Sequence, residues 1–267
     1  MACLRASLLF SGFMAAATPA LAGPNLVQNG DFSSYTNNNG QSNPNIGFEA
    51  DYNGTVTGWS SGGVNNPYYN FLFLNGTAQN PAAETGAWSS YGYLGLWDAN
   101  NSGGANTWNG NGPTGVASNF MALDGDFGTG PVSQTITGLT KGSVYAVTFY
   151  YAFAQQEGFT GPTTQGLTVG LGSSAKSVPL YNLPSQGFSG WMQETFYLEA
   201  DSSSDALSFL AFGNVQLPPF ALISDISMVD APEPSAWAVM GIGLLGLVGA
   251  ARMRRAKVAP AGIDGAA

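Results

Sequence analysis

Apolar and polar side chains alternate with a period of two along much of this 267-residue chain, and this alternation restricts its fold more than any other feature. The clearest example is residues 144–154, where one face is lined by aromatic and aliphatic side chains and the other face is also largely apolar. A glycine or proline interrupts almost every window of a dozen residues, which excludes long helices from the body of the chain. The pattern therefore predicts an all-β fold, an antiparallel β-sandwich or jelly roll.

Nine segments have strand character, and they are separated by turn signals. They are residues 69–74, 87–96, 120–123, 132–137, 144–154, 167–171, 193–198, 207–212 and 221–229. Because both of its faces are apolar, the segment 144–154 is predicted to lie at the centre of a sheet. Residues 40–118 are rich in Asn and Gly, so long loops between short strands are predicted there.

Residues 1–22 have the features of a signal peptide. One basic residue, Arg5, precedes a short apolar stretch, and Ala20-Leu21-Ala22 is the pattern that signal peptidase cuts. A buried N-terminal helix is the alternative interpretation. Cleavage would remove Cys3, the single cysteine, so the exported chain would form no disulfide.

The C-terminal region combines three features in a fixed order. A Pro-Glu-Pro sequence precedes an uncharged apolar run at 236–251, which is near the short limit for a transmembrane helix, and a basic cluster follows. The residues concerned are Pro232, Glu233, Pro234, Arg252, Arg254 and Arg255. The basic cluster predicts that the end of the helix stays in the cytoplasm.

This order resembles the PEP-CTERM class of exosortase substrates. The resemblance implies cleavage near Pro-Glu-Pro by the membrane protease exosortase, after an inner-membrane intermediate, and delivery to the surface or matrix of a Gram-negative bacterium. A plain C-terminal membrane anchor is the alternative. The predicted organisation is a signal peptide (1–22), a β-sandwich ectodomain (23–230), a sorting signal with its transmembrane helix (231–257) and a short tail (258–267).

The body also resembles galactose-binding-like jelly rolls in its opening, at residues 25–32 and Gly58-Trp59, and in a closing strand pair at 207–212 and 221–229. The resemblance implies a structural calcium at Asp31 and Asp225, although Ser33 stands where such proteins often have Glu. Asp98 begins a second oxygen-rich loop, which suggests either a calcium site or an ordinary loop rich in Asp and Asn.

Charge and composition exclude several function classes. Between residues 23 and 230 there are two lysines, no arginine and fourteen acidic residues, so a nucleic-acid partner is not expected. With no histidine in the chain, a Ser-His-Asp triad and a histidine-ligated zinc site are excluded. Asp124 and Asp126 are predicted to form a solvated turn instead of a catalytic carboxylate pair, and the chain is not expected to be an enzyme.

The resulting hypothesis is an exported surface protein with a structural or adhesive role in an exopolysaccharide layer. The alternative is a carbohydrate-binding module that uses exposed aromatic side chains, and the remaining one is a carboxylate-based glycoside hydrolase. The candidate sugar-stacking residues are Tyr68, Tyr69, Trp97 and Trp108. Of these, Trp108 lies in the most polar surroundings and is predicted to be the most exposed.

Overall fold

The computed structural model describes residues 23–38, 47–62, 68–75, 87–89, 92–113, 118–213 and 217–231. Residues Gly23–Ala231 form a compact unit with its own hydrophobic core, as expected of a domain that folds by itself. The predicted signal peptide at 1–22, the sorting signal and helix from residue 232 onward, and the tail at 258–267 lie outside the described residues. Within the described ranges, no helix is suited to crossing a membrane.

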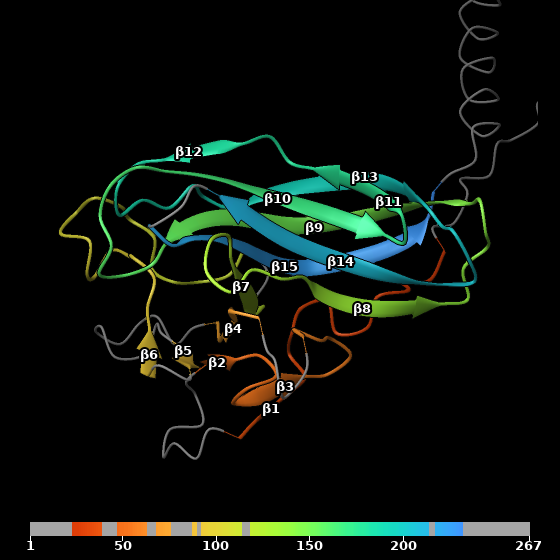
Figure 1. The fold of residues 1–267 in the computed structure, drawn as a ribbon, viewed down its shortest axis with the longest axis horizontal. Helices are drawn as coiled ribbons and strands as arrows, with labels where there is room; N and C mark the ends of the chain where they lie inside the picture. Colours follow the sequence, from red (N-terminus) through yellow and green to blue (C-terminus); the bar gives the residue numbers. More distant parts are fainter. Residues whose placement is uncertain are drawn as a thin grey trace, which may run out of the picture. The chain divides into compact units, whose positions relative to one another are not determined.

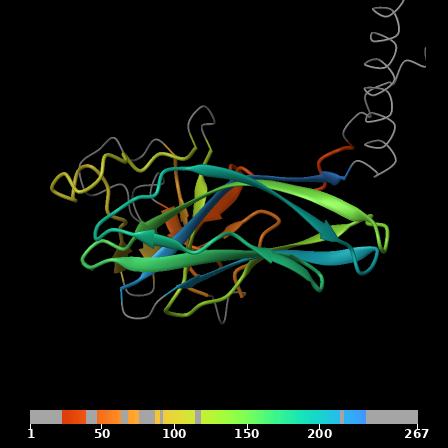
Figure 2. The same cartoon turned by 90° about the horizontal axis from the view of Figure 1, so that it is seen from above.

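The domain is an all-β sandwich with one large sheet and one smaller sheet (Figures 1 and 2), which confirms the predicted fold class. The large sheet has the order β13-β9-β15-β7-β4-β2-β5-β6. Its strands are β13 (Met192–Glu199), β9 (Val144–Gln155), β15 (Pro219–Asp230), β7 (Phe120–Asp124), β4 (Asn70–Phe73), β2 (Gly47–Glu49), β5 (Ala87–Ser89) and β6 (Gly92–Leu94). All pairs are antiparallel except β2 with β5.

The smaller sheet has the order β11-β10-β14-β8, with one further strand, β12, paired to β10. Its strands are β8 (Val132–Thr137), β10 (Thr163–Leu171), β11 (Ser174–Ser177), β12 (Tyr181–Leu183) and β14 (Ser204–Gly213). A separate ribbon pairs β1 (Tyr35–Asn37) with β3 (Gly54–Val56).

Each of the nine predicted segments contains a strand, and the segment 87–96 contains two, β5 and β6. Strands β1, β2, β3, β11 and β12 were not predicted, because they have only three or four residues and show no alternation long enough to recognise. The predicted pairing of 207–212 with 221–229 is wrong. These segments are β14 and β15, which lie in opposite sheets and face each other across the core.

The main core lies between the two sheets. Alternate residues of β9, from Tyr145 to Phe153, point into it and meet Leu167 of β10 and Phe209 of β14. Phe149 is fully buried, and its ring meets Phe209 edge-on at 5.5 Å. Strand β9 is an interior strand between β13 and β15, as predicted from its two apolar faces.

A second core covers part of the other face of the large sheet. Phe71, Phe120 and Phe220 project from this face and are buried beneath loop residues. The indole of Trp108 stacks on Phe188 with ring centroids 4.2 Å apart, and both tryptophans of this region, Trp108 and Trp191, donate to the carbonyl of Asn111. The Asn-rich loop therefore covers the apolar strands, and the two indole N–H groups hold it there by bonding to its Asn111 carbonyl.

Candidate functional site

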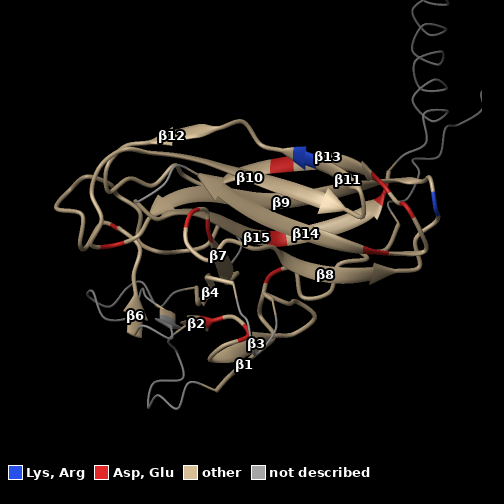
Figure 3. Ribbon diagram, viewed as in Figure 1, with Lys and Arg blue, Asp and Glu red and all other residues tan. Residues whose placement is uncertain are grey.

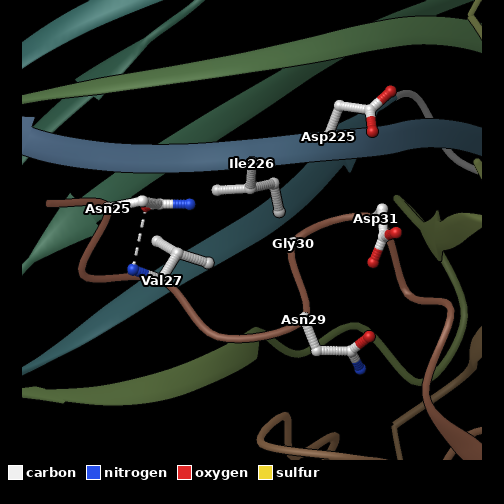
Figure 4. A pocket seen from close by; sticks show the side chains of 7 residues that line it. All are labelled: Asn25, Val27, Asn29, Gly30, Asp31, Asp225 and Ile226. Carbon is white, nitrogen blue, oxygen red and sulfur yellow. Dashed lines mark hydrogen bonds between the residues drawn. The ribbon is translucent and has the colours of Figure 1, made fainter. Parts of the chain in front are cut away.

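An open pocket of about 340 Å³ lies where the N-terminal segment meets β15 (Figure 4). Its lining residues are Asn25, Val27, Asn29, Gly30, Asp31, Asp225 and Ile226. Figure 4 shows Asp31 and Asp225 at the same end of the pocket, one from the N-terminal segment and the other from β15. The two carboxylates that the sequence singled out are therefore brought together by the fold.

The N-terminal segment lines one side of the pocket by bonding to the edge of β15. Leu26 donates its N–H to the carbonyl of Met228 at 2.8 Å, and Ile226 donates to the carbonyl of Gly30 at 3.0 Å. A Cβ atom on Gly30 would lie 2.0 Å from the Ile226 carbonyl oxygen, so this close approach of two backbones requires glycine.

The same segment is bonded to the opposite sheet. The backbone N–H and carbonyl of Gln28 form two hydrogen bonds of 2.8 Å with the side-chain amide of Gln134 on β8. The Asn29 amide donates to the carbonyls of Ser34 and Thr57, and the Trp59 indole donates to the carbonyl of Asn29 at 3.1 Å. The opening motif is thus hydrogen-bonded to β15 of the large sheet and to β8 of the smaller sheet, and these bonds hold it beside the pocket.

Three non-glycine residues around the pocket have left-handed backbone conformations. They are Asn29 with φ 52°, Phe32 with φ 54° and Asp225 with φ 49°. Such conformations are disfavoured for L-residues and persist only where the surrounding structure imposes them. Asp225 lies within the register shift of β15 between Ser224 and Ser227, and this bulge interrupts the ladder to β9 at the position of the carboxylate.

The carboxyl group of Asp225 is only partly satisfied. Its Oδ1 accepts a hydrogen bond from the Ser118 hydroxyl, whereas its Oδ2 is buried and has no hydrogen-bond partner. Burial raises the pKa of Asp225, and the nearby negative charge of Asp31 raises it further, while the Ser118 hydroxyl opposes the shift. Ser118 is 107 residues away in the chain, and nothing in the sequence pointed to it.

A bound cation, or a proton on the carboxyl group, would satisfy the unpaired Oδ2 atom of Asp225. The hydroxyl of Ser33 donates to Asp31 at 2.9 Å, so Ser33 is a neutral donor to the site. Among the residues that the structure describes, no three His, Cys, Asp or Glu side chains converge as a metal site would require. The unpaired Asp225 oxygen and the neighbouring Asp31 carboxylate would nevertheless suit a hard cation. Such an ion would complete its coordination shell with carbonyl oxygens and water.

The four aromatic candidates pack against different parts of the domain. Tyr69 packs edge-on against Phe71, the ring of Tyr68 lies over Gly130, and the half-buried Trp97 donates to the Phe159 carbonyl at 2.7 Å. The predicted exposure of Trp108 is wrong, because only 8% of its surface is accessible. Its indole N–H donates to the backbone carbonyl of Asn111, and the ring packs in the second core.

Asp98 is also buried, and its carboxylate accepts the backbone N–H groups of Asn100 and Asn101 at 2.7 and 3.2 Å. These bonds form an Asx turn, which is the ordinary-loop alternative left open by the sequence. Asp124 likewise accepts the N–H groups of Asp126 and Phe127, so a turn is present. The prediction that this turn is solvated is wrong for Asp124, whose side chain is 1% exposed.

Comparisons with solved structures return carbohydrate-binding modules with low similarity. The module TmCBM61, solved with β-1,4-galactotriose, is 16% identical over 42% of this chain and 70% of its own, with a TM-score of 0.28. A CBM4 module is 18% identical over 60% and 94%, with a TM-score of 0.29. A candidate sugar-binding protein from Bacteroides thetaiotaomicron is 14% identical over 78% and 100%, with a TM-score of 0.31. These scores are too low to support a conclusion about a ligand.

None of the curated proteins matches the sequence. Residues 230–255, by contrast, match the PEP-CTERM protein-sorting motif. The motif begins at Asp230, the last residue of β15, so it starts where the sandwich ends. The chain therefore carries a C-terminal signal for exosortase-dependent export and sorting to the cell envelope.

Proposed function

We propose that this chain is a structural or adhesive protein of the cell surface or extracellular matrix of a Gram-negative bacterium. The observation that carries the proposal is the sorting motif at 230–255, attached directly to the end of a compact β domain. Signal peptidase, exosortase and the exopolysaccharide layer are the partners that this role requires.

The physical chemistry of the tail supports an inner-membrane intermediate. The run at 236–251 is uncharged and apolar, and the arginines after it are costly to move into hydrocarbon, so they would hold the end of the helix in the cytoplasm. Pro232 and Pro234 disfavour continuation of the helix toward the domain. The backbone around Glu233 would then be extended at the outer interface, where a membrane protease can reach it.

Mass spectrometry of the surface-extracted protein tests this processing. We expect a mature chain that begins at Gly23 and ends between residues 232 and 235, without the apolar run. Recovery of an intact peptide through Arg252 from the surface fraction would show that the tail is a plain anchor.

In this proposal the chain is not an enzyme. The absence of histidine removes imidazole-based catalysis, and Asp124 is engaged by two backbone N–H groups beside Asp126. Recombinant protein should therefore give no saturable release of reducing sugar from polysaccharides, and such release would support the glycoside hydrolase alternative.

For the pocket, calcium is the ion that its oxygen donors favour, with Asp31 and Asp225 as its carboxylate ligands. We expect millimolar calcium to raise the melting temperature relative to a chelator, because a ligand that binds only the folded state stabilises it. Asp225→Asn should abolish this difference, whereas Glu199→Gln, at an exposed position of β13, should retain it. An equal calcium response in both variants would place the ion elsewhere.

A further inference from the structure

The outward side of the smaller sheet is a surface without charge. In β14 the residues alternate strictly, with Leu207, Phe209 and Ala211 in the core and Ser208, Leu210 and Phe212 facing outward. Strands β8 and β10 alternate in the same way, and their outward positions are Ser, Thr or Gly. We call the outward-facing residues of β8, β10, β11, β12 and β14 the neutral face.

The five strands contain two charged residues, Asp205 and Lys176, and the register places neither on this face. Asp205 pairs with the core residue Ile136, is buried, and accepts the N–H of Asp201 at 2.8 Å. Lys176 pairs with the core residue Val169. In Figure 3 the strands of this sheet are almost entirely tan. In a body with fourteen acidic residues, a whole sheet face without charge fits an uncharged partner.

An aromatic ring lies on the neutral face near the C-terminal end of β14. Phe212 stands directly opposite Gly166 of β10, and a Cβ atom on that glycine would lie 2.2 Å from the Phe212 ring. The ring thus covers the bare backbone of β10, while 36% of the residue's surface remains exposed. Its neighbour Leu210, opposite Thr168, is 37% exposed. Covering a glycine is a structural role, but it leaves an aromatic surface open to solvent.

Hydrogen-bonding groups flank this ring along β10. The hydroxyl of Thr164 donates to the amide oxygen of Asn182 at 2.8 Å, and the hydroxyls of Thr168 and Ser177 are 2.8 Å apart. A hydroxyl can both donate and accept hydrogen bonds, and the Asn182 amide has two N–H donors. A flat ring between two polar pairs is suited to a sugar ring, whose apolar face stacks while its hydroxyls form hydrogen bonds.

We propose that the neutral face binds an uncharged polysaccharide, with a sugar ring stacked on Phe212 and its hydroxyls bonded to the Thr164–Asn182 and Thr168–Ser177 pairs. This site would give the proposed surface protein a ligand. It rests on the proposed function only in that the protein would meet the polymer at the cell surface. The residues of this site differ from the four aromatic candidates of the sequence and lie on four strands, β10, β11, β12 and β14.

Native gel electrophoresis of residues 23–231, in gels containing hydroxyethylcellulose, mixed-linkage β-glucan or galactomannan, tests this site. We expect at least one of these uncharged polymers to retard the protein. Phe212→Ala should weaken the retardation by about tenfold or more, because the aromatic contact with the sugar ring is lost. Thr168→Glu should abolish it by placing a charge on the face. Tyr197→Ala, which removes an exposed tyrosine from the other sheet, should have no effect.

Melting temperatures of all variants separate binding from folding, and Phe212→Tyr should keep both the fold and the retardation. The inference is overturned if none of the three polymers retards the protein, or if retardation survives Phe212→Ala. It is also overturned if sedimentation shows that Phe212 instead holds two copies together. Sorting is measured independently by the mature chain ends, so a correctly processed protein that binds no polymer would contradict this inference alone.

Discussion

Asp124 shows how one residue can differ from its sequence-based prediction. It follows the apolar part of β7, and its carboxylate turns back to accept two N–H groups of the following loop. Its Oδ2 atom is buried without a hydrogen-bond partner. Burial raises the pKa of Asp124 from 3.8 to about 7, against the opposing effect of the two backbone N–H groups.

The raised pKa predicts that the domain loses stability as the pH rises from about 4 to about 7. In this window the unfolded chain has released the proton that folded Asp124 retains, so the free energy of unfolding falls with pH and levels off above the folded pKa. At about 1.4 kcal/mol for each pKa unit, the loss is at most roughly 4 kcal/mol.

Urea unfolding of wild type and Asp124→Asn at both ends of this window measures the effect. The Asn amide does not titrate, so the variant should lose less stability between the two pH values. Its oxygen can still accept from the two N–H groups. The raised pKa values of Asp225 and Glu157 act in the same direction in both proteins and cancel in the comparison. An identical pH dependence in the two proteins would show that Asp124 is ionised in the folded state.

At the scale of elements, β9 connects the two cores of the domain. The alternate residues that begin with Tyr145 enter the core between the sheets, whereas Ala152 and Ala154 lie under the second core. Small residues on the second face allow the loop that carries Trp108 to approach the sheet. The strand is paired along its length with β13 and β15, so changes in its packing affect the whole large sheet.

Phe149→Ala should therefore destabilise the domain by roughly 3–5 kcal/mol, the usual cost of removing a fully packed phenyl ring. The ring is fully buried and contacts Tyr151, Phe196 and Phe209. Val144→Ala, at an exposed position of the same strand, should change stability by less than about 0.5 kcal/mol. Equal effects of the two substitutions in denaturant titrations would contradict the assigned faces of β9.

At the scale of the whole molecule, the two ends of the domain lie together. A Cβ atom on Gly23 would be 3.0 Å from a carboxylate oxygen of Asp230, and Ala231 still donates its N–H to the carbonyl of Val144. Gly23 and Ala231, the first and last residues of the domain, therefore lie at the same end of the sandwich. Only Ala231 separates the last strand from the Pro-Glu-Pro sequence.

Deleting residues 232–234 should leave the uncut chain in the inner membrane, because it removes the extended segment that the protease would recognise. Fractionation and immunoblotting would detect this as loss of the surface form and accumulation of a longer membrane form. A matched deletion of residues 258–260, beyond the motif, should be processed normally. Normal release of the 232–234 variant would contradict the sorting proposal.

The sequence by itself determined the class of fold, the interior position of β9 and the sorting motif, because alternation, turn residues and a short linear motif are local properties of the chain. It also identified Asp31 and Asp225, but only through a resemblance. Tertiary structure alone decided that Ser118 bonds to Asp225, that Trp108 and Asp124 are buried, and that Phe212 lies on a charge-free face. These features depend on which distant segments pair and in what register. The alternation of a strand has the same period of two whether a given face packs against a core or meets solvent, so it cannot distinguish the two cases.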